Sequence, residues 1–379
     1  MYDCVYHSVR MRKKRLQRRS VLRASAAAAS GIGLASLAGC VGNGDDGQQQ
    51  LGNPEFTEGR PEPGGTTMAE LPDLEGEMTV YSGRSERRVG ELITYIEEMY
   101  DGFEVNVRYA DSADLVNAIQ VEEETPADIY YTTESGTLTF LRNEGYTTTM
   151  PEHVLELCPE EFRDPQDHWL GLTRRSWAVA FNTDRFTAAD IPEDIMAFPD
   201  HEELASEMGW APFRGSTQAF VTAMRLLHGE DETREWIADM LEAGLETYEG
   251  GRSDLARATG DGEVNASLYN HYIIRGNLDM PLDVTYTKND AGVVPIVPGA
   301  CVLDDSDDPD TAANFIAHWA SAEAQEYFAT TTWEYPISPH VDPLDALPDR
   351  DELDPPEIDL NELADIETTL QLLRDLDVL

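Results

Sequence analysis

Basic residues are scarce in this sequence. Lysine and arginine together number 27 against 73 aspartates and glutamates, and eight of the basic residues precede Cys40. Beyond Cys40 the only lysine is Lys288. Such a chain repels nucleic-acid phosphates, which argues against a nucleic-acid partner. Its charges also repel one another in dilute buffer but are screened in molar salt, where the Debye length falls to ~3 Å. The simplest source is an extreme halophile, with archaea favoured.

Although the chain is acidic, it is not poor in hydrophobic residues. Hydrophobic residues make up 41% of the chain, six of them are tryptophan, and they recur at regular spacings. An acidic disordered protein is therefore excluded, because such chains lack the apolar surface that folding requires. The sequence predicts a folded protein whose carboxylates say little about its ligand.

Cysteines and catalytic motifs are few as well. Of the four cysteines, Cys4 precedes the expected start of the product, and Cys158 and Cys301 can either pair outside the cell or remain buried thiols. The sequence holds no Gly-x-Ser-x-Gly elbow, phosphate-cradling Gly-Lys loop, His-Glu-x-x-His or Cys-x-x-Cys motif. We therefore expect no enzyme, with a secreted hydrolase as a remote alternative and a passive surface protein weaker still.

The N-terminus is typical of an export signal. Arg18 and Arg19 stand before a small and apolar run, residues 24–38, which is the pattern of a twin-arginine signal. The run ends in Leu37-Ala38-Gly39-Cys40, similar to a lipobox, so Cys40 is the expected lipid-modified first residue of the mature chain. Met11 is the expected start. A transmembrane anchor is the alternative, but the run is shorter than the ~20 residues that a spanning helix needs. We expect the protein at the outer face of the cytoplasmic membrane, anchored by lipid.

The next segment predicts a tether. Residues 41–75 are rich in Gly, Pro, Asp, Glu and Gln without periodicity, as in flexible linkers. The remainder, residues 76–379, is long enough for two lobes of ordinary domain size.

The first lobe alternates strands and helices. Strands are predicted at residues 78–81, 103–109 and 126–131, with helices between them that bury Val89, Leu92, Ile93 and Ile96 in the first and Leu115, Val116, Ile119 and Val121 in the second. This β-α-β-α-β order predicts an α/β fold with a mostly parallel sheet and a ligand beyond the carboxyl ends of its strands.

Two loops lie at those strand ends. The first holds Ser82, Arg84 and Glu86, and the second holds Thr133 and Glu134. Each places a carboxylate and hydroxyl groups at a helix start, a geometry that suits a small polar ligand. For Glu86 and Glu134 the alternative is a solvated carboxylate that stabilises the helix through its dipole.

Further along the chain, candidate anion-binding groups occur in two places. Arg175 lies in the alternating strand 174–182 and either faces a ligand or pairs with one of the many carboxylates. Arg214, Gly215, Ser216 and Thr217 open a helix that ends near Gly229, and free amides there can hold an oxyanion. The alternative for this second group is simply a capped helix.

The segment from Gly262 to Ile273 contains Gly-Glu, five residues, then Tyr269-Asn270-His271-Tyr272. It resembles the Gly-Glu-…-Asn-His-Tyr-Tyr segment of ferric-ion-binding proteins, the receptors of iron(III) ABC importers. Residues 80–86, 126–131, 211–217 and 333–337 also resemble that family, in the same order. Here Ile273 replaces the second tyrosine, and Tyr269, Tyr130 and Tyr131 are the possible substitutes.

The resemblance implies a two-lobed periplasmic-binding-protein type 2 fold, each lobe a mostly parallel sheet flanked by helices, joined by two crossing strands. Its expected parts are the signal at residues 1–40, the tether at 41–75, lobe 1 at 76–178, lobe 2 at 179–285, and the return to lobe 1 at 286–379. Residues 174–182 would make the first crossing, and residues 290–302 the second.

The resemblance also implies a function. The protein would be a monomer that captures ferric iron between its lobes and delivers it to a membrane permease and its ATPase. Tyr272, Glu134 and Glu86 would then hold Fe(III), because phenolate and carboxylate oxygens suit a hard cation. Carbonate, phosphate or citrate would complete the shell at Ser82, Arg84, Arg175, Arg214, Gly215, Ser216, Thr217 and Asn270, with no catalytic cofactor. Asn270 and His271 can instead position the loop. The alternative is a receptor for an organic anion or an intact iron chelate.

Overall fold

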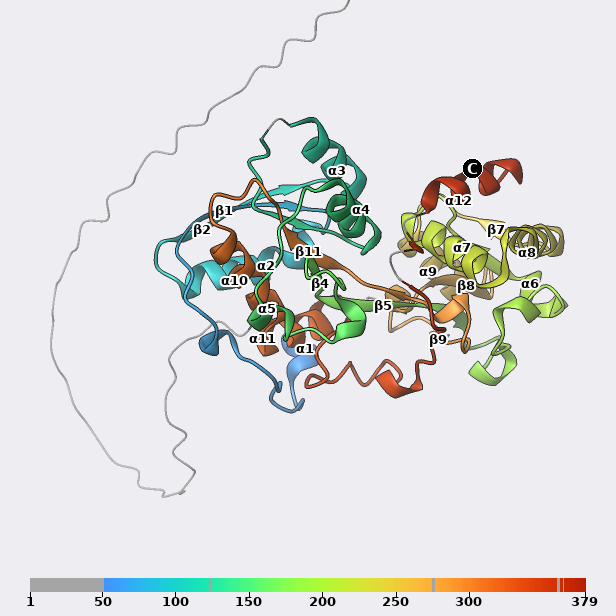
Figure 1. Ribbon diagram of the computed structural model, residues 1–379. Helices are drawn as coiled ribbons and strands as arrows, with labels where there is room; N and C mark the ends of the chain where they lie inside the picture. Colours follow the sequence, from blue (N-terminus) through green and yellow to red (C-terminus); the bar gives the residue numbers. More distant parts are fainter. Residues whose placement is uncertain (1–50, 123, 275–276, 360–361, 364) are drawn as a thin grey trace, which may run out of the picture. The chain divides into compact units, whose positions relative to one another are not determined.

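The computed structural model describes residues 51–379 except 123, 275, 276, 360, 361 and 364 (Figure 1). The predicted export signal and Cys40 lie outside the described residues. The described residues form one compact unit. Among the helices that the structure describes, none has both the length and the apolarity required to cross a membrane.

The first sheet has the strand order β2-β1-β3-β11-β4. Its strands are β1 (Gly76–Ser82), β2 (Phe103–Tyr109), β3 (Ile129–Tyr131), β4 (Trp169–Gly171) and β11 (Gly299–Val302). β1 pairs in parallel with β2 and β3, with Val80 opposite both Val107 and Ile129, which confirms the predicted β-α-β-α-β unit. β11 adds antiparallel pairs with β3 and β4.

The second sheet is built around β5 (Thr173–Asn182), which pairs in antiparallel fashion with β8 (Ala266–Asn270), β9 (Leu282–Thr285), β10 (Pro295–Ile296) and β12 (Tyr335–Pro336). β6 (Met208–Trp210) joins β8 and β7 (Glu246–Thr247) in parallel. The parallel pairs of this sheet thus lie away from β5.

Helices flank both sheets (Figure 1). The α-helices are α1 (Pro54–Thr57), α2 (Glu86–Met99), α3 (Ser112–Val121), α4 (Gly136–Glu144), α5 (Glu152–Leu155), α6 (Glu202–Ala205), α7 (Gly215–His228), α8 (Glu230–Ala243), α9 (Arg252–Gly260), α10 (Pro309–Ala320), α11 (Ala322–Tyr327) and α12 (Ile366–Asp375). Short 3₁₀ turns lie at Met68–Glu70, Glu160–Phe162, Ala188–Asp190, Ile195–Ala197, His271–Ile274, Ala291–Val293 and Arg350–Glu352, and a π-helical turn at Phe328–Thr332.

Apolar spacing accounts for the buried faces of these helices. Val89, Leu92, Ile93 and Ile96 recur at helical spacing and are all buried against the first sheet, as predicted. Val121 differs from its prediction: it is 81% exposed at the last position of α3, because it follows the buried Ile119 by two residues and so points away from the face that Leu115, Val116 and Ile119 bury.

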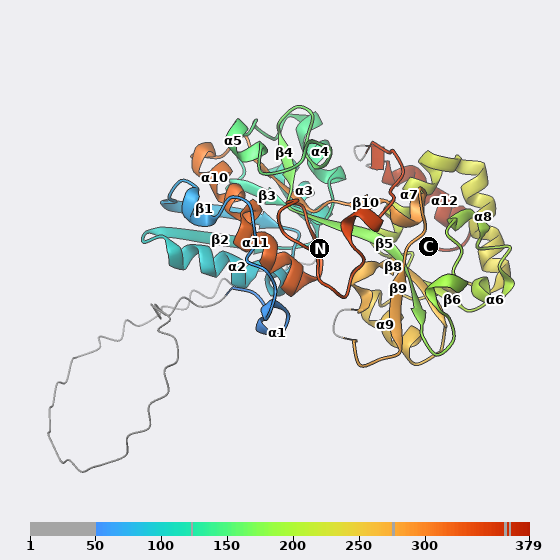
Figure 2. The ribbon, with the colours of Figure 1, turned by 90° about the horizontal axis from the view of Figure 1, so that it is seen from below.

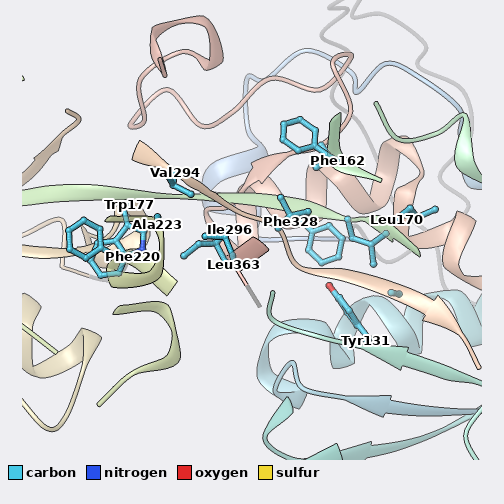
Figure 3. Close-up of a cluster of buried hydrophobic side chains, with 14 of the residues drawn as sticks. Tyr131, Phe162, Leu170, Trp177, Phe220, Ala223, Val294, Ile296, Phe328 and Leu363 are labelled. Carbon is cyan, nitrogen blue, oxygen red and sulfur yellow. The ribbon is translucent and has the colours of Figure 1, made fainter. Parts of the chain in front are cut away.

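The chain passes between the sheets at β4 and β5, which are separated by one residue, and again between β10 and β11 (Figure 2). Both crossings were predicted from sequence. One apolar core continues along them, from Tyr131, Leu170 and Phe328 at the first sheet, past Ile296 and Leu363, to Trp177 and Phe220 at the second (Figure 3). The burial of each such side chain contributes roughly 1.5–3 kcal/mol.

The second part of the predicted tether is not a flexible linker. Residues 51–75 pack on the fold: Met68 is fully buried, Phe56 meets the ring of Trp333 edge-on, and Arg60 forms a two-pronged ion pair with Glu326. The polar composition hid these few anchoring side chains.

The two cysteines of the folded unit, which the sequence left as either a pair or separate thiols, are separate. Cys158 and Cys301 are both buried and free.

Candidate functional site

A cleft of about 700 Å³ is lined by residues of both sheets. From the first sheet come the β1–α2 loop, the N-terminus of α3 and the β3–α4 loop, all at the carboxyl ends of parallel strands. From the second sheet come the start of α7 and the end of β8. Its lining is Gly83, Arg84, Ser85, Arg88, Asp111, Ser112, Ala113, Thr133, Glu134, Thr137, Arg175, Phe213, Arg214, Gly215, Ser216, Gln218, Ala219, Tyr269, Tyr272, Ile296 and Ile366.

Most of the predicted site residues meet in this cleft. Those that line it are Tyr272, Glu134, Arg84, Arg175, Arg214, Gly215 and Ser216. Those that do not line it are Glu86, Ser82, Thr217 and Asn270.

Tyr272 lies in the 3₁₀ turn that follows β8 and is 5% exposed. The Nη1 group of Arg175 donates to its hydroxyl at 3.5 Å, and the guanidinium of Arg88 stands over its ring at 5.0 Å from the centroid. Burial raises the pKa of this phenol, but the charges of Arg175 and Arg88 outweigh burial, so the pKa lies below its ordinary value. The two arginines therefore stabilise the phenolate form of Tyr272 relative to that of an ordinary tyrosine.

Glu334, which does not line the cleft, forms ion pairs with two of the cleft arginines. Its carboxylate, fully buried, accepts hydrogen bonds from Arg84 at 2.9 Å, Arg88 at 3.0 Å and the Thr173 hydroxyl at 2.7 Å. Burial acts to raise the pKa of Glu334, but Arg84 and Arg88 outweigh it and the pKa falls to about 2. This carboxylate is thus charged at neutral pH and fixes where both guanidinium groups stand.

His271 fastens the turn that carries Tyr272. Its Nε2 lies 2.7 Å from the carbonyl oxygen of Trp333, and its Nδ1 lies 3.1 Å from the backbone nitrogen of Ser176 on β5. Burial lowers the pKa of His271 to about 4, so the ring is neutral at pH 7. These contacts are those expected of a residue that positions the turn.

Glu134 lines the cleft two residues before α4 begins. Its carboxylate accepts a hydrogen bond from the Gly136 backbone nitrogen at 2.7 Å, which is the helix-start role that the sequence left open. Burial raises the pKa of Glu134 in spite of this bond. A cation in the cleft would relieve that cost, so the two interpretations are compatible.

Glu86 lies elsewhere. It is the first residue of α2, whose first turn places Ser85 and Arg88 at the cleft and turns Glu86 toward a separate pocket of about 400 Å³ that also holds Glu91 and Tyr109. The helical rotation of about 100° per residue makes this separation unavoidable.

Of the other candidates that do not line the cleft, Ser82 and Thr217 bond within the chain through their side chains, and Asn270 does not within the described residues. The Ser82 hydroxyl donates to the backbone oxygen of Arg84 at 2.9 Å, and the Thr217 hydroxyl donates to that of Ala211 at 2.7 Å. Asn270 is fully buried, and neither polar atom of its side chain has a hydrogen-bond partner among the described residues.

The arginines reach the cleft by different routes. Arg175 and Arg174 point to opposite faces of β5, so Arg175 meets the cleft while Arg174 lies 5.9 Å from the ring of Phe162. Arg214 precedes α7 and donates to the backbone oxygens of Glu249 and Gly250 at 3.3 and 2.9 Å. It is therefore held at the rim beside the amides of the helix start.

The three possible substitutes for the missing second tyrosine have different surroundings. The hydroxyl of Tyr130 donates to Ser112 O and meets the Thr137 hydroxyl, each at 3.1 Å. Tyr131 is fully buried, with Arg84 5.7 Å from its ring centroid. Tyr269 lines the cleft, whereas Ile273 is completely buried in the apolar core of the second sheet.

The side chains of the cleft that can coordinate a cation do so through oxygen atoms. Within the described part of the chain, no three His, Cys, Asp or Glu side chains are grouped so that they could hold a metal ion. Phenol and carboxylate oxygens remain as ligands for a hard cation, and four arginines line the cleft against the carboxylates of Glu134 and Asp111. The arrangement can therefore accommodate a cation only together with negatively charged groups.

Sequence reasoning missed Arg88 and Glu334. Arg88 lies in the first turn of α2, directly after the loop that the sequence had already singled out, so a signal was present. Glu334 stands 250 residues from Arg84 and carries no local signal.

Comparison with known proteins identifies the family. Residues 91–354 match the family of bacterial extracellular solute-binding proteins. Iron uptake protein A2 of Synechocystis sp. is 30% identical over 271 residues, which cover 66% of this chain and 76% of that protein. The major ferric iron-binding protein of Neisseria meningitidis serogroup B is 24% identical over 78% of this chain and 92% of its own.

Solved structures with a similar fold support the assignment. Iron-bound HitA from Pseudomonas aeruginosa superposes with a TM-score of 0.72 at 27% identity, over 80% of this chain and 99% of HitA. A Trichodesmium protein in complex with iron and citrate superposes with a TM-score of 0.69 at 17% identity, over 79% and 99% of the two chains, and supports the fold alone. The periplasmic-binding-protein type 2 fold is thereby confirmed, and the chain belongs to the bacterial extracellular solute-binding protein family.

Proposed function

We propose that this protein captures ferric iron in the cleft between its two sheets, outside the cytoplasmic membrane, and delivers it to the permease and ATPase of an ABC importer. The observation that carries the proposal is the phenol of Tyr272, which lines the cleft with a pKa lowered, against burial, by Arg175 and Arg88. Relatives with iron in their names and the iron-bound HitA structure support it.

Tyr272 and Glu134 are the proposed metal ligands. They belong to different sheets, so a cation that bonds to both would favour a closed arrangement of the cleft, which the importer can recognise. Glu86 is not retained, since it faces another pocket. A monomer anchored through lipid on Cys40 remains part of the proposal.

The four arginines point to an accompanying anion. Arg84, Arg88, Arg175 and Arg214 surround the cleft, and a bare trivalent cation would be repelled by them. Carbonate, phosphate or citrate would offset that repulsion, held by the guanidinium groups and by the amides at Gly215 and Ser216. The same observation favours the second candidate, a receptor for an organic anion or an intact iron chelate.

Titration of the folded protein with ferric citrate in molar KCl tests the proposal. A visible phenolate-to-iron charge-transfer band that saturates at one metal per chain is expected, and Tyr272→Phe should remove most of it. Binding of citrate alone, with no band when iron is added, would replace ferric iron by the organic-anion alternative.

A further inference from the structure

The N-terminal segment of the described chain, residues 51–60, packs on the π-helical turn that precedes Trp333. Gly52 approaches this turn so closely that a Cβ atom added to it would lie 2.9 Å from the hydroxyl oxygen of Thr330. Phe56, in α1, meets the ring of Trp333 edge-on, with 5.1 Å between the centroids and 84° between the planes. The segment therefore contacts both the turn and the residue that follows it.

A second anchor fastens the segment at Arg60. Its guanidinium group donates to both carboxylate oxygens of Glu326, at 2.7 and 3.0 Å, and to the backbone oxygens of Pro343 and Asp342, at 2.9 and 2.7 Å. The two side chains of the ion pair are only 11% and 13% exposed, so water screens their attraction less than that of a surface pair. Glu326 lies two residues before the π-helical turn, so the segment is held at both ends of the stretch 326–333.

Trp333 has a backbone conformation that is unfavourable for its residue type. Its φ and ψ of 60° and 29° lie in the left-handed region, where the Cβ atom comes too close to the following carbonyl oxygen. The π-helical turn before it is also a rare conformation, one that occurs frequently at functional sites. Such a backbone persists only when surrounding contacts hold it. The indole ring is 1% exposed, and Phe56 contributes a direct ring contact to its packing.

Trp333 and the residue after it are joined to both sides of the cleft. The carbonyl oxygen of Trp333 accepts a hydrogen bond at 2.7 Å from Nε2 of His271, in the turn that carries Tyr272 on the second-sheet side. The next residue, Glu334, accepts hydrogen bonds from two cleft arginines on the first-sheet side. A change in the backbone conformation of Trp333 would therefore displace groups on both sides of the ligand site.

We propose that Phe56 is a positioning residue of the cleft: it holds Trp333 in the left-handed conformation, so that the groups joined to Trp333 keep their places. These groups are the turn that carries Tyr272 and the carboxylate of Glu334. The inference rests on the proposed function, because its consequence is a change in ligand affinity. The N-terminal segment precedes the part of the chain that matches the family, so this contact is a feature of the chain that the match does not include.

The first test compares amide hydrogen exchange of residues 271–274 in the ligand-free protein, in molar KCl, for the unmodified chain, Phe56→Ala, Phe56→Tyr and Phe140→Ala. Phe56→Ala removes the ring contact and should speed exchange in this turn about 5- to 30-fold, the factor that corresponds to the cost of one left-handed residue. Phe56→Tyr keeps the ring and should exchange as the unmodified chain does. Phe140→Ala is the matched control, because it truncates a phenylalanine of α4 that is 36% exposed and does not line the cleft.

The second test is the affinity for ferric citrate, measured well below the melting temperature of every variant. Phe56→Ala should weaken it about 5- to 30-fold. The same substitution should have no further effect in the Trp333→Gly background, because glycine adopts the left-handed conformation without support from a neighbouring ring. An equal loss of affinity in both backgrounds would show that Phe56 does not act through Trp333 and would overturn the inference. If Trp333→Gly does not fold, the exchange comparison decides.

The outcomes separate this inference from the proposed function. Equal exchange in Phe56→Ala and Phe140→Ala overturns the inference even if the unmodified chain binds iron as proposed. Faster exchange with unchanged affinity overturns the positioning role as well. If the unmodified chain binds no iron, the proposed function fails, whereas the role of Phe56 is still tested by the exchange rates and by the affinity for citrate alone.

Discussion

Replacement of Glu334 by glutamine should destabilise the protein far more than loss of an ordinary ion pair. The amide keeps the shape of the side chain but removes the negative charge that compensates Arg84, which is 2% exposed, and Arg88. An arginine left buried without its carboxylate costs about 3–5 kcal/mol.

The pKa of Glu334 gives a second estimate of this destabilisation, and it agrees with the first. The pKa of Glu334 lies at about 2 in the folded protein, against ~4.3 for an unperturbed glutamate, a difference worth about 3 kcal/mol. Because the folded pKa is the lower one, this stabilisation is complete above pH ~4.3 and is lost as the pH falls toward 2.

The assay is thermal unfolding in molar KCl, followed by circular dichroism, for the unmodified chain, Glu334→Gln and Glu193→Gln. The control removes the carboxylate from the Lys288–Glu193 pair, whose side chains are 51% and 70% exposed and which is worth about 0–1 kcal/mol. We expect Glu334→Gln to lower the melting temperature by about 5–10 °C at pH 7 and the control to lower it by little. Equal effects of the two substitutions would refute the reasoning.

Two further predictions concern the turn that carries Tyr272. The pKa of His271, lowered by burial to about 4, makes its neutral form the stabilising one, so stability present above pH ~6.5 should fall by about 3 kcal/mol as the pH drops to 4. His271→Gln should flatten that part of the stability curve in chemical denaturation, and curves that run parallel would contradict it. Arg175→Met should raise the pKa of the Tyr272 phenol, measured by ultraviolet titration against Tyr272→Phe, and weaken ferric binding about 10- to 100-fold. Arg214→Met, which removes a rim charge held by backbone oxygens, should leave that phenol pKa nearly unchanged, and a matching shift there would show that Arg175 has no special role.

Local patterns in the sequence determined much of the fold. The spacing of Val89, Leu92, Ile93 and Ile96 predicted the buried face of α2, and the strand at β1 was found where its apolar residues placed it. These succeed because helix and strand periodicity depend on residues only a few positions apart. The same locality identified Glu134, which follows a strand that ends at the cleft, whereas Tyr272 was identified by the resemblance of its segment to ferric-ion-binding proteins.

Only the tertiary structure decided how those groups are used. It directed Glu86 to another pocket, committed the hydroxyls of Ser82 and Thr217 to backbone oxygens, and brought Tyr269 into the cleft while Ile273 entered the core. It also placed Glu334 beneath two arginines almost the whole folded chain away. Such contacts depend on the packing of two sheets against shared crossing strands, a long-range arrangement that no window of neighbouring residues encodes. The sequence by itself determined which residues are candidates for the site, and the packing decided which of them face the ligand and with what charge.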